Sequence, residues 1–172
     1  MKKIVKHLVF VFFCILFSAK AFSQEIDFRE YLGQEIGSLP YAFEKRNLPN
    51  EEYNYFEVRN PCYFLGLPFS HLAIRTDKDN IINRGSFNVK KKITKELFDT
   101  LNKKYGTPYR ILAADTLQVI HNEYENSTST KLIDVTTYNE NIVTLKYRSN
   151  SVHINFDFAF NTMSAEFKYV KE

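Results

Sequence analysis

The last third of the chain alternates apolar and polar residues with a period of two, and this pattern constrains the fold more than any other feature. The alternation runs through residues 143–148, 152–160 and 165–169. A period of two places every second side chain on the same side of an extended strand. The connections between the segments are short enough for hairpins. The pattern therefore predicts neighbouring antiparallel strands with one buried face and one polar face.

Residues 94–105 have helical spacing instead. Four apolar residues recur on one face of this segment, and Gly106 and Pro108 end it. Near the start of the mature chain, Asp27 and Glu30 have the spacing of a capping box, which predicts a short helix. A second short helix is predicted over residues 39–46, where Ser38 can cap the first turn.

Further strands are predicted at residues 55–59, 69–75, 81–89, 116–123 and 132–137, and residues 125–130 are predicted to form a polar tip. The order is helices, strands, one helix, strands. This order predicts an α+β fold, with an antiparallel meander sheet, short N-terminal helices and one central helix packed on one face. We expect residues 24–172 to form a single domain, because their number suits one hydrophobic core.

Residues 1–23 have the layout of a secretory signal peptide. Three lysines precede an apolar run at residues 8–17, which is too short to span a bilayer. Ala21 and Ser23 are small residues at the positions that a signal peptidase reads, so cleavage is expected after Ser23. Cys14 lies inside the apolar run with no small residue before it, which argues against a lipid anchor. The mature protein is expected to be exported, periplasmic or extracellular, with no membrane span.

The charge of the chain argues against a nucleic-acid partner. The full sequence has a formal net charge of +3. Four lysines of the predicted signal peptide supply this excess, so the remaining chain is close to neutral and lacks the positive surplus of a nucleic-acid-binding domain. The partner expected from the sequence is an envelope or extracellular protein.

Cys62 is the one cysteine that follows the signal peptide, so no intramolecular disulfide is expected. It lies in the apolar segment 61–65, and a buried packing role is the favoured interpretation. The alternative is a small exported hydrolase in which Cys62 is the nucleophile, His71 or His153 is the base and Asp157 orients that base. No nucleophile elbow, phosphate-binding glycine loop or zinc-protease helix supports an enzyme. No catalytic residue is therefore assigned.

The set His71, His121 and His153 also raises the question of a metal site. His121 with Glu123, and His153 with Asp157, each share one face of a predicted strand and could supply ligands suited to zinc. No second spacing motif supports such a cluster. The sequence analysis therefore predicts no metal and no cofactor.

Residues 101–108 end the central helix and lead into strands with the sequence Leu-Asn-Lys-Lys-Tyr-Gly-Thr-Pro. This junction resembles the helix-to-strand junction of β-lactamase-inhibitor-protein-like and outer-membrane-assembly-lipoprotein-like domains. The chain departs from both groups, because it lacks the lipobox of the lipoproteins and the disulfide pairs of the inhibitors. The resemblance implies non-catalytic protein binding through a sheet face or a loop.

The binding surface predicted from the sequence is the polar face of the C-terminal strands. Its candidate residues are Lys146, Arg148, His153, Asn155 and Asp157. From these observations we expect an exported, non-catalytic binding or protein-interaction module. The alternative is the hydrolase or metal-binding protein built on Cys62 or the histidines.

Overall fold

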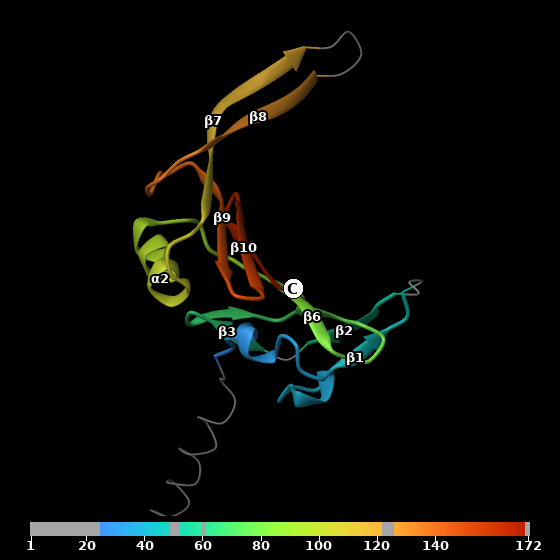
Figure 1. Ribbon diagram of the computed structural model, residues 1–172. Helices are drawn as coiled ribbons and strands as arrows, with labels where there is room; N and C mark the ends of the chain where they lie inside the picture. The colour runs from blue at the N-terminus through green and yellow to red at the C-terminus, as the bar shows by residue number, and fades with distance from the viewer. Residues whose placement is uncertain (1–24, 49–51, 60, 122–125, 171–172) are drawn as a thin grey trace, which may run out of the picture.

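The computed structural model describes residues 25–48, 52–59, 61–121 and 126–170, without the side chains of residues 116–121 and 126–129. The predicted signal peptide and its cleavage position lie outside the described residues. The described chain forms a nine-stranded antiparallel sheet, a separate two-stranded hairpin, one α-helix and two short 3-10 turns (Figure 1). The class is therefore α+β, as the sequence predicts. No helix in the described part is long and apolar enough to cross a membrane.

The elements have these bounds in chain order: η1 Phe28–Tyr31, η2 Ile36–Ser38, β1 Glu44–Arg46, β2 Asn54–Val58, β3 Cys62–Phe64, β4 Leu67–Phe69, β5 Leu72–Thr76, β6 Ile82–Val89, α2 Lys95–Tyr105, β7 Arg110–His121, β8 Asn126–Asp134, β9 Ile142–Ser149, β10 Val152–Ala159 and β11 Thr162–Tyr169. The strand order in the large sheet is β1-β2-β5-β6-β11-β10-β9-β7-β8. The pair β3–β4 stands apart from it.

The three C-terminal strands form the antiparallel meander that their alternation predicts. Strand β10 pairs with β9 on one side and with β11 on the other. Apolar residues such as Ile154 and Phe156 are buried, and the intervening residues point to the opposite, outer face. The meander joins the N-terminal strands through β11, which pairs with β6. This long-range pairing makes a single sheet of both halves of the chain.

Helix α2 begins after Thr94, whose hydroxyl accepts a hydrogen bond from Leu97 N at 3.2 Å. It ends at Gly106, which has a φ of 85° that suits a residue without a Cβ atom. Leu97, Phe98, Leu101 and Tyr105 are buried, as the helical spacing predicts. The Tyr105 ring lies 5.5 Å from the Phe156 ring of β10, centroid to centroid.

The predicted N-terminal helices are corrected by the structure. The first is only the four-residue 3-10 turn η1, with the Asp27 side chain accepting from Arg29 N. The second is wrong, because residues 44–46 form strand β1, which pairs with β2. The first turn does not extend into a longer helix because Gly33 N donates to Ile82 O at 2.8 Å and Ile36 N donates to Asn80 O at 2.9 Å. These bonds use amides that a longer helix would need.

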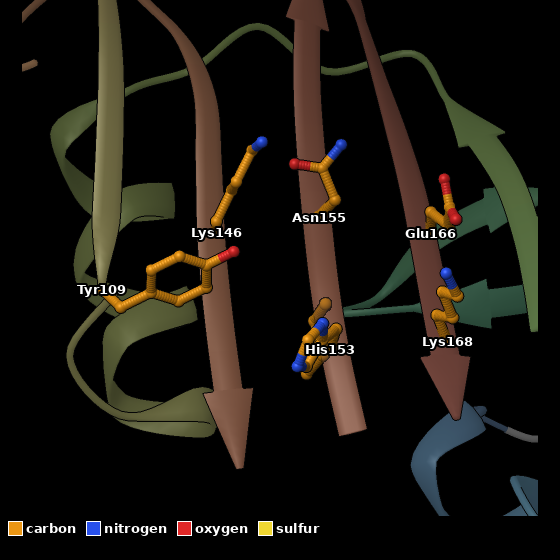
Figure 2. A pocket seen from close by; sticks show the side chains of 7 residues that line it. Tyr109, Lys146, His153, Asn155, Glu166 and Lys168 are labelled. Carbon is orange, nitrogen blue, oxygen red and sulfur yellow. The ribbon is translucent and has the colours of Figure 1, made fainter. Parts of the chain in front are cut away.

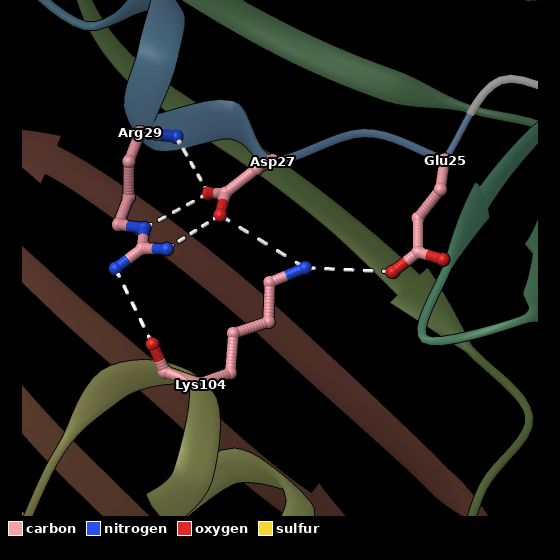
Figure 3. A network of polar contacts seen from close by, with 4 residues as sticks. All are labelled: Glu25, Asp27, Arg29 and Lys104. Atoms are coloured by element: carbon pink, nitrogen blue, oxygen red, sulfur yellow. Dashed lines mark hydrogen bonds and ion pairs between the residues drawn. The ribbon is translucent and has the colours of Figure 1, made fainter.

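The N-terminal segment is fastened to α2 by charges as well as by packing. Asp27 accepts two hydrogen bonds from the Arg29 guanidinium, at 2.9 and 2.5 Å (Figure 3). Arg29 also donates to the carbonyl of Lys104 at 3.5 Å, and Lys104 Nζ lies 3.4 Å from Glu25 Oε1. The Arg29 guanidinium stacks 4.6 Å from the Tyr105 ring centroid. This network ties the turn at Asp27 to the last turn of the helix.

Residues 116–121 of the strand predicted at 116–123 belong to the longer β7, and residues 126–130 of the expected polar tip belong to strand β8. Residues 122, 123 and 125 of these two predictions lie outside the described residues. The two strands pair through most of their length. Figure 1 shows them as a long ribbon that rises beyond the rest of the sheet. Threonine, which is enriched in strands, recurs at residues 128 and 130 in the first half of β8.

The hydrophobic core lies on one side of the large sheet, which we call the inner face. Rings from the hairpin β3–β4, from η1 and from α2 meet rings of the sheet there. The ring centroids of Phe64 in β3 and Phe87 in β6 are 5.1 Å apart, and those of Phe28 in η1 and Phe167 in β11 are 6.1 Å apart. The opposite, outer face of the sheet carries the polar residues of the alternating strands. Any site of the sheet that is open to a ligand is therefore sought on the outer face.

Candidate binding surface on the outer face of the sheet

All five candidate residues from the sequence lie on the outer face, on two adjacent strands. Lys146 of β9 is directly opposite Asn155 of β10, and Arg148 is opposite His153. Asp157 is opposite Thr144. The alternation of β9 and β10 and their antiparallel register bring these residues together.

Three of the five candidates line a shallow pocket of about 220 Å³ on this face (Figure 2). The pocket is lined by Tyr109, Lys146, His153, Ile154, Asn155, Glu166 and Lys168. Figure 2 shows the side chains standing on neighbouring strands, with Tyr109 reaching across β9 from the start of β7. We call this pocket the His153 pocket. Its wall comes from three strands of the meander and from the segment that leads into β7.

The sequence analysis missed Tyr109, Glu166 and Lys168. The signal for Glu166 and Lys168 was present, because both occupy polar positions of the alternating segment that becomes β11. Tyr109 has no such signal. It reaches the pocket because its backbone N–H donates to the Lys146 carbonyl at 2.9 Å, which places the start of β7 beside β9.

Two shielded polar atoms in the His153 pocket lack a hydrogen-bond partner. They are Nε2 of His153 and Oδ1 of Asn155, and neither has a partner among the described residues. The orientation of the Asn155 amide is fixed by chemistry, because its Nδ2 donates to Asp157 Oδ2 at 2.6 Å and a carboxylate can only accept. Oδ1 therefore faces away from this bond as an acceptor without a donor. Shielded polar groups without partners cost stability unless a ligand or water supplies the bond.

Asp157 orients its neighbours and does not face the pocket as a free carboxylate. Its Oδ1 accepts from the Thr144 hydroxyl at 2.7 Å, while Oδ2 accepts from Asn155. The structure therefore gives Asp157 a positioning role, with Asn155 in contact with the pocket.

The lysines that line the pocket are not paired with carboxylates of the described residues. No described carboxylate lies within ion-pairing distance of Lys146, Arg148 or Lys168. The carboxylate of Glu166 is already paired with Arg84, at 2.8 Å. Burial, together with the charges of Arg148 and Lys168, lowers the pKa of His153 below its ordinary value. An anion bound at this position would meet uncompensated positive charge.

A second shallow pocket of about 220 Å³ lies on the same face, over the N-terminal half of the sheet. It is lined by Tyr55, Ala73, Ile74, Arg75, Arg84 and Ser86. Arg75 Nε donates to Asn83 Oδ1 at 2.8 Å, and its guanidinium lies 4.3 Å from the centroid of the Tyr53 ring. We call this the Arg75 pocket. This pocket therefore gives the outer face an arginine whose position is fixed by a hydrogen bond and by an aromatic ring.

The residues of the alternative function do not come together. Cys62 is only 1% exposed and belongs to the core, and burial raises the pKa of its thiol. His71 contacts the carboxylate of Glu57. His71 directly precedes β5, whereas His153 lies on β10. Strands β11 and β6 lie between β10 and β5, so the two histidines are not neighbours in the sheet. The side chain of His121 lies outside the described residues. No group of three or more His, Cys, Asp or Glu in the described part of the chain is arranged to hold a metal ion.

Comparisons with protein-family models, with curated proteins and with solved structures find no significant match.

Proposed function

We propose that this protein is a non-catalytic binding module whose outer sheet face binds a ligand that carries negative charge and a hydrogen-bond donor. The observation that carries the proposal is the His153 pocket. Its shielded acceptor, Asn155 Oδ1, is unpaired, and the lining residues Lys146 and Lys168 have no carboxylate partner among the described residues. An anion with an adjacent hydroxyl or N–H would satisfy both features at once.

The proposal includes the arrangement of the inner face. We take α2 and the N-terminal turns as a cover for the apolar side of the sheet, which leaves the outer face for the ligand. Ring contacts of Tyr105 and Phe28 with β10 and β11 support this arrangement. Truncating Leu101 to Ala should lower the unfolding free energy by about 2 to 5 kcal/mol, and Lys103→Ala should change it little. Equal, small effects of the two changes on the unfolding free energy would contradict the packing of α2 on the apolar side of the sheet.

Export and the single-domain organisation are part of the same proposal. The signal-like layout of residues 1–23 supports export to the periplasm or beyond the cell, and the continuous sheet supports one domain over residues 24–172. A partner in the envelope or outside the cell follows from that location. The intact mass of the secreted protein tests the cleavage after Ser23. A retained leader or an added lipid would contradict it.

A binding measurement with a small anionic sugar tests the function. The probe is galacturonate, with neutral galactose as the matched control, and the method is isothermal titration calorimetry on the purified protein. We expect saturable binding of galacturonate, no detectable binding of galactose, and galacturonate recovered chemically unchanged. Lys168→Gln should weaken binding at least about threefold, because it removes an unpaired cation of the pocket.

The matched control variant is Lys103→Gln, which removes an equal charge from an exposed position on α2. It should leave the affinity unchanged. Equal weakening by both variants would show that the attraction is a general effect of charge. Chemical conversion of the probe would show that the protein is an enzyme. Either result would contradict the proposal, as would the absence of binding.

A further inference from the structure

The two pockets on the outer face are connected by one transverse line of basic side chains. Each strand from β9 to β5 contributes one residue to this line, and the register of the sheet places each residue directly opposite the next. We call it the basic row. In spatial order its members are Arg148, His153, Lys168, Arg84 and Arg75. Tyr55 of β2 and Arg46 of β1 continue the same line.

Three positions of the basic row carry a cation without a carboxylate partner among the described residues. Glu166 neutralises Arg84, and the lowered pKa of His153 favours the neutral imidazole. For Arg148, Lys168 and Arg75, no described carboxylate lies within ion-pairing distance. These three residues stand on alternate strands of the row, namely β9, β11 and β5.

The spacing of the row narrows the class of ligand. Neighbouring strands lie about 4.8 Å apart, so the four steps from β9 to β5 cover roughly 19 Å, and the unpaired cations recur about every 9.6 Å. An extended acidic peptide presents side chains to one face only about every 6.7 Å. A nucleic-acid strand in a duplex carries one phosphate per roughly 3.4 Å. A linear polyuronate whose successive rings face opposite ways presents a carboxylate to one side at every second ring, a repeat close to two strand spacings.

The other groups on this face suit a sugar polymer as well. Asn155 Oδ1 needs a donor beside the anion, and the ring hydroxyls of a uronate supply one, whereas a phosphodiester group has none. Tyr109 is 59% exposed at one pocket, and Tyr55 lines the other. Aromatic rings at such positions present apolar faces to the C–H faces of sugar rings.

We propose that the basic row is the binding track for a linear polyuronate, with sugar carboxylates held at Arg148, Lys168 and Arg75 on alternate strands from β9 to β5. The proposal rests on the proposed function, because it takes the His153 pocket as one part of a longer site. It adds the Arg75 pocket as the other end. The ligand lies across the strands, so its affinity depends on its length.

Binding of galacturonate oligomers of increasing length tests the track. Isothermal titration calorimetry with the monomer, the dimer and the hexamer should give an affinity that rises with length and a hexamer affinity that falls with salt concentration. Arg75→Gln should weaken hexamer binding at least about threefold and leave monomer binding at the His153 pocket unchanged. Lys168→Gln should weaken both, and Lys103→Gln neither.

The outcomes separate the two proposals. If the hexamer binds no more tightly than the monomer and Arg75→Gln has no effect on hexamer binding, the track is overturned and the binding function stays in place. If neither the galacturonate monomer nor the hexamer binds, the track and the proposed binding function are both overturned. Hexaglutamate and a single-stranded hexanucleotide serve as competing polyanions. Tighter binding of either one would replace the polyuronate with a protein or a nucleic-acid partner.

Discussion

His153 on β10 stands directly opposite Lys168 on β11, and the positive charge of that lysine acts against protonation of the imidazole. Burial is the larger cause of the lowered pKa of His153, and the charges of Arg148 and Lys168 add to it. Other charged or titratable groups at the pocket are Tyr109, Lys146 and Glu166. The carboxylate of Glu166 is held by Arg84, which limits its ability to stabilise an imidazolium.

The first prediction concerns this titration. His153 should titrate in the folded protein below about 6.5, the value for an unperturbed histidine, and Lys168→Gln should raise its pKa. Because the unfolded chain binds the proton more readily, the unfolding free energy should fall as the pH drops below about 6.5. It should stop falling below the folded pKa. NMR of the imidazole C–H signals measures both values. An unchanged pKa in Lys168→Gln would contradict the assigned cause.

The second prediction concerns Asp27 and its bond to Arg29. Burial alone would raise the pKa of Asp27, but the hydrogen bonds and charge of Arg29, with Lys104, outweigh burial and hold the pKa below its usual value. Asp27→Asn should therefore lower the unfolding free energy by about 1 to 3 kcal/mol at neutral pH. A lowered carboxyl pKa stabilises the fold above the unfolded pKa and ceases to do so as the pH falls through the folded one. The difference should accordingly shrink below about pH 4.

Denaturant unfolding at several pH values measures the effect of Asp27→Asn. The control is Asp99→Asn, which removes an exposed carboxylate that pairs with Lys95 one helical turn away. Its cost should be about 0.5 kcal/mol or less. Losses of equal size in the two variants would show that the network of Figure 3 does not fasten the N-terminal segment.

The third prediction concerns the contact between Gly85 and Phe28. A Cβ atom at Gly85 on β6 would overlap the ring of Phe28, which is fully buried. Gly85→Ala should therefore lower the unfolding free energy by about 1 to 3 kcal/mol. Gly37→Ala is the matched control, because its Cβ would meet nothing within 4 Å. In a double-mutant cycle, Phe28→Leu should recover part of the loss caused by Gly85→Ala. Strict additivity of the two changes would contradict the contact.

The fourth prediction decides between the binding function and a thiol enzyme. Burial raises the pKa of Cys62, so a thiol reagent should react slowly with the folded protein and rapidly after denaturation. Absorbance during reaction with an aromatic disulfide follows both rates. Reaction of the folded protein faster than a small free thiol at neutral pH would point to an activated nucleophile. It would reverse the choice of function.

Much of the C-terminal half could be predicted from the sequence, because its signals are local. The alternation that gives β9, β10 and β11 depends on neighbouring residues, and short connections make such strands adjacent in space. Helix α2 likewise carries its own start at Thr94 and its own end at Gly106. The five candidate residues on β9 and β10 share one face for the same local reason.

The N-terminal half and the rest of the outer face could not be predicted in this way. The Asp27 side chain does cap the first turn, but amides of the following residues bond to the 80–82 segment instead of continuing a helix. The pairing of β6 with β11 joins residues far apart in sequence. Arg84 and Arg75 enter the basic row only through that pairing. No local pattern around either arginine indicates that it lies in line with His153.

The side-chain signals of arginine test the central claim most directly, because each reports one position. In ¹H–¹⁵N spectra recorded during a titration with hexagalacturonate, the Nε–Hε signals of Arg148, Arg84 and Arg75 should shift together and saturate. Arg29, which is held by Asp27 beside α2, should not move. The account is contradicted if Arg29 shifts as much as the outer arginines, or if none of the signals of the basic row responds.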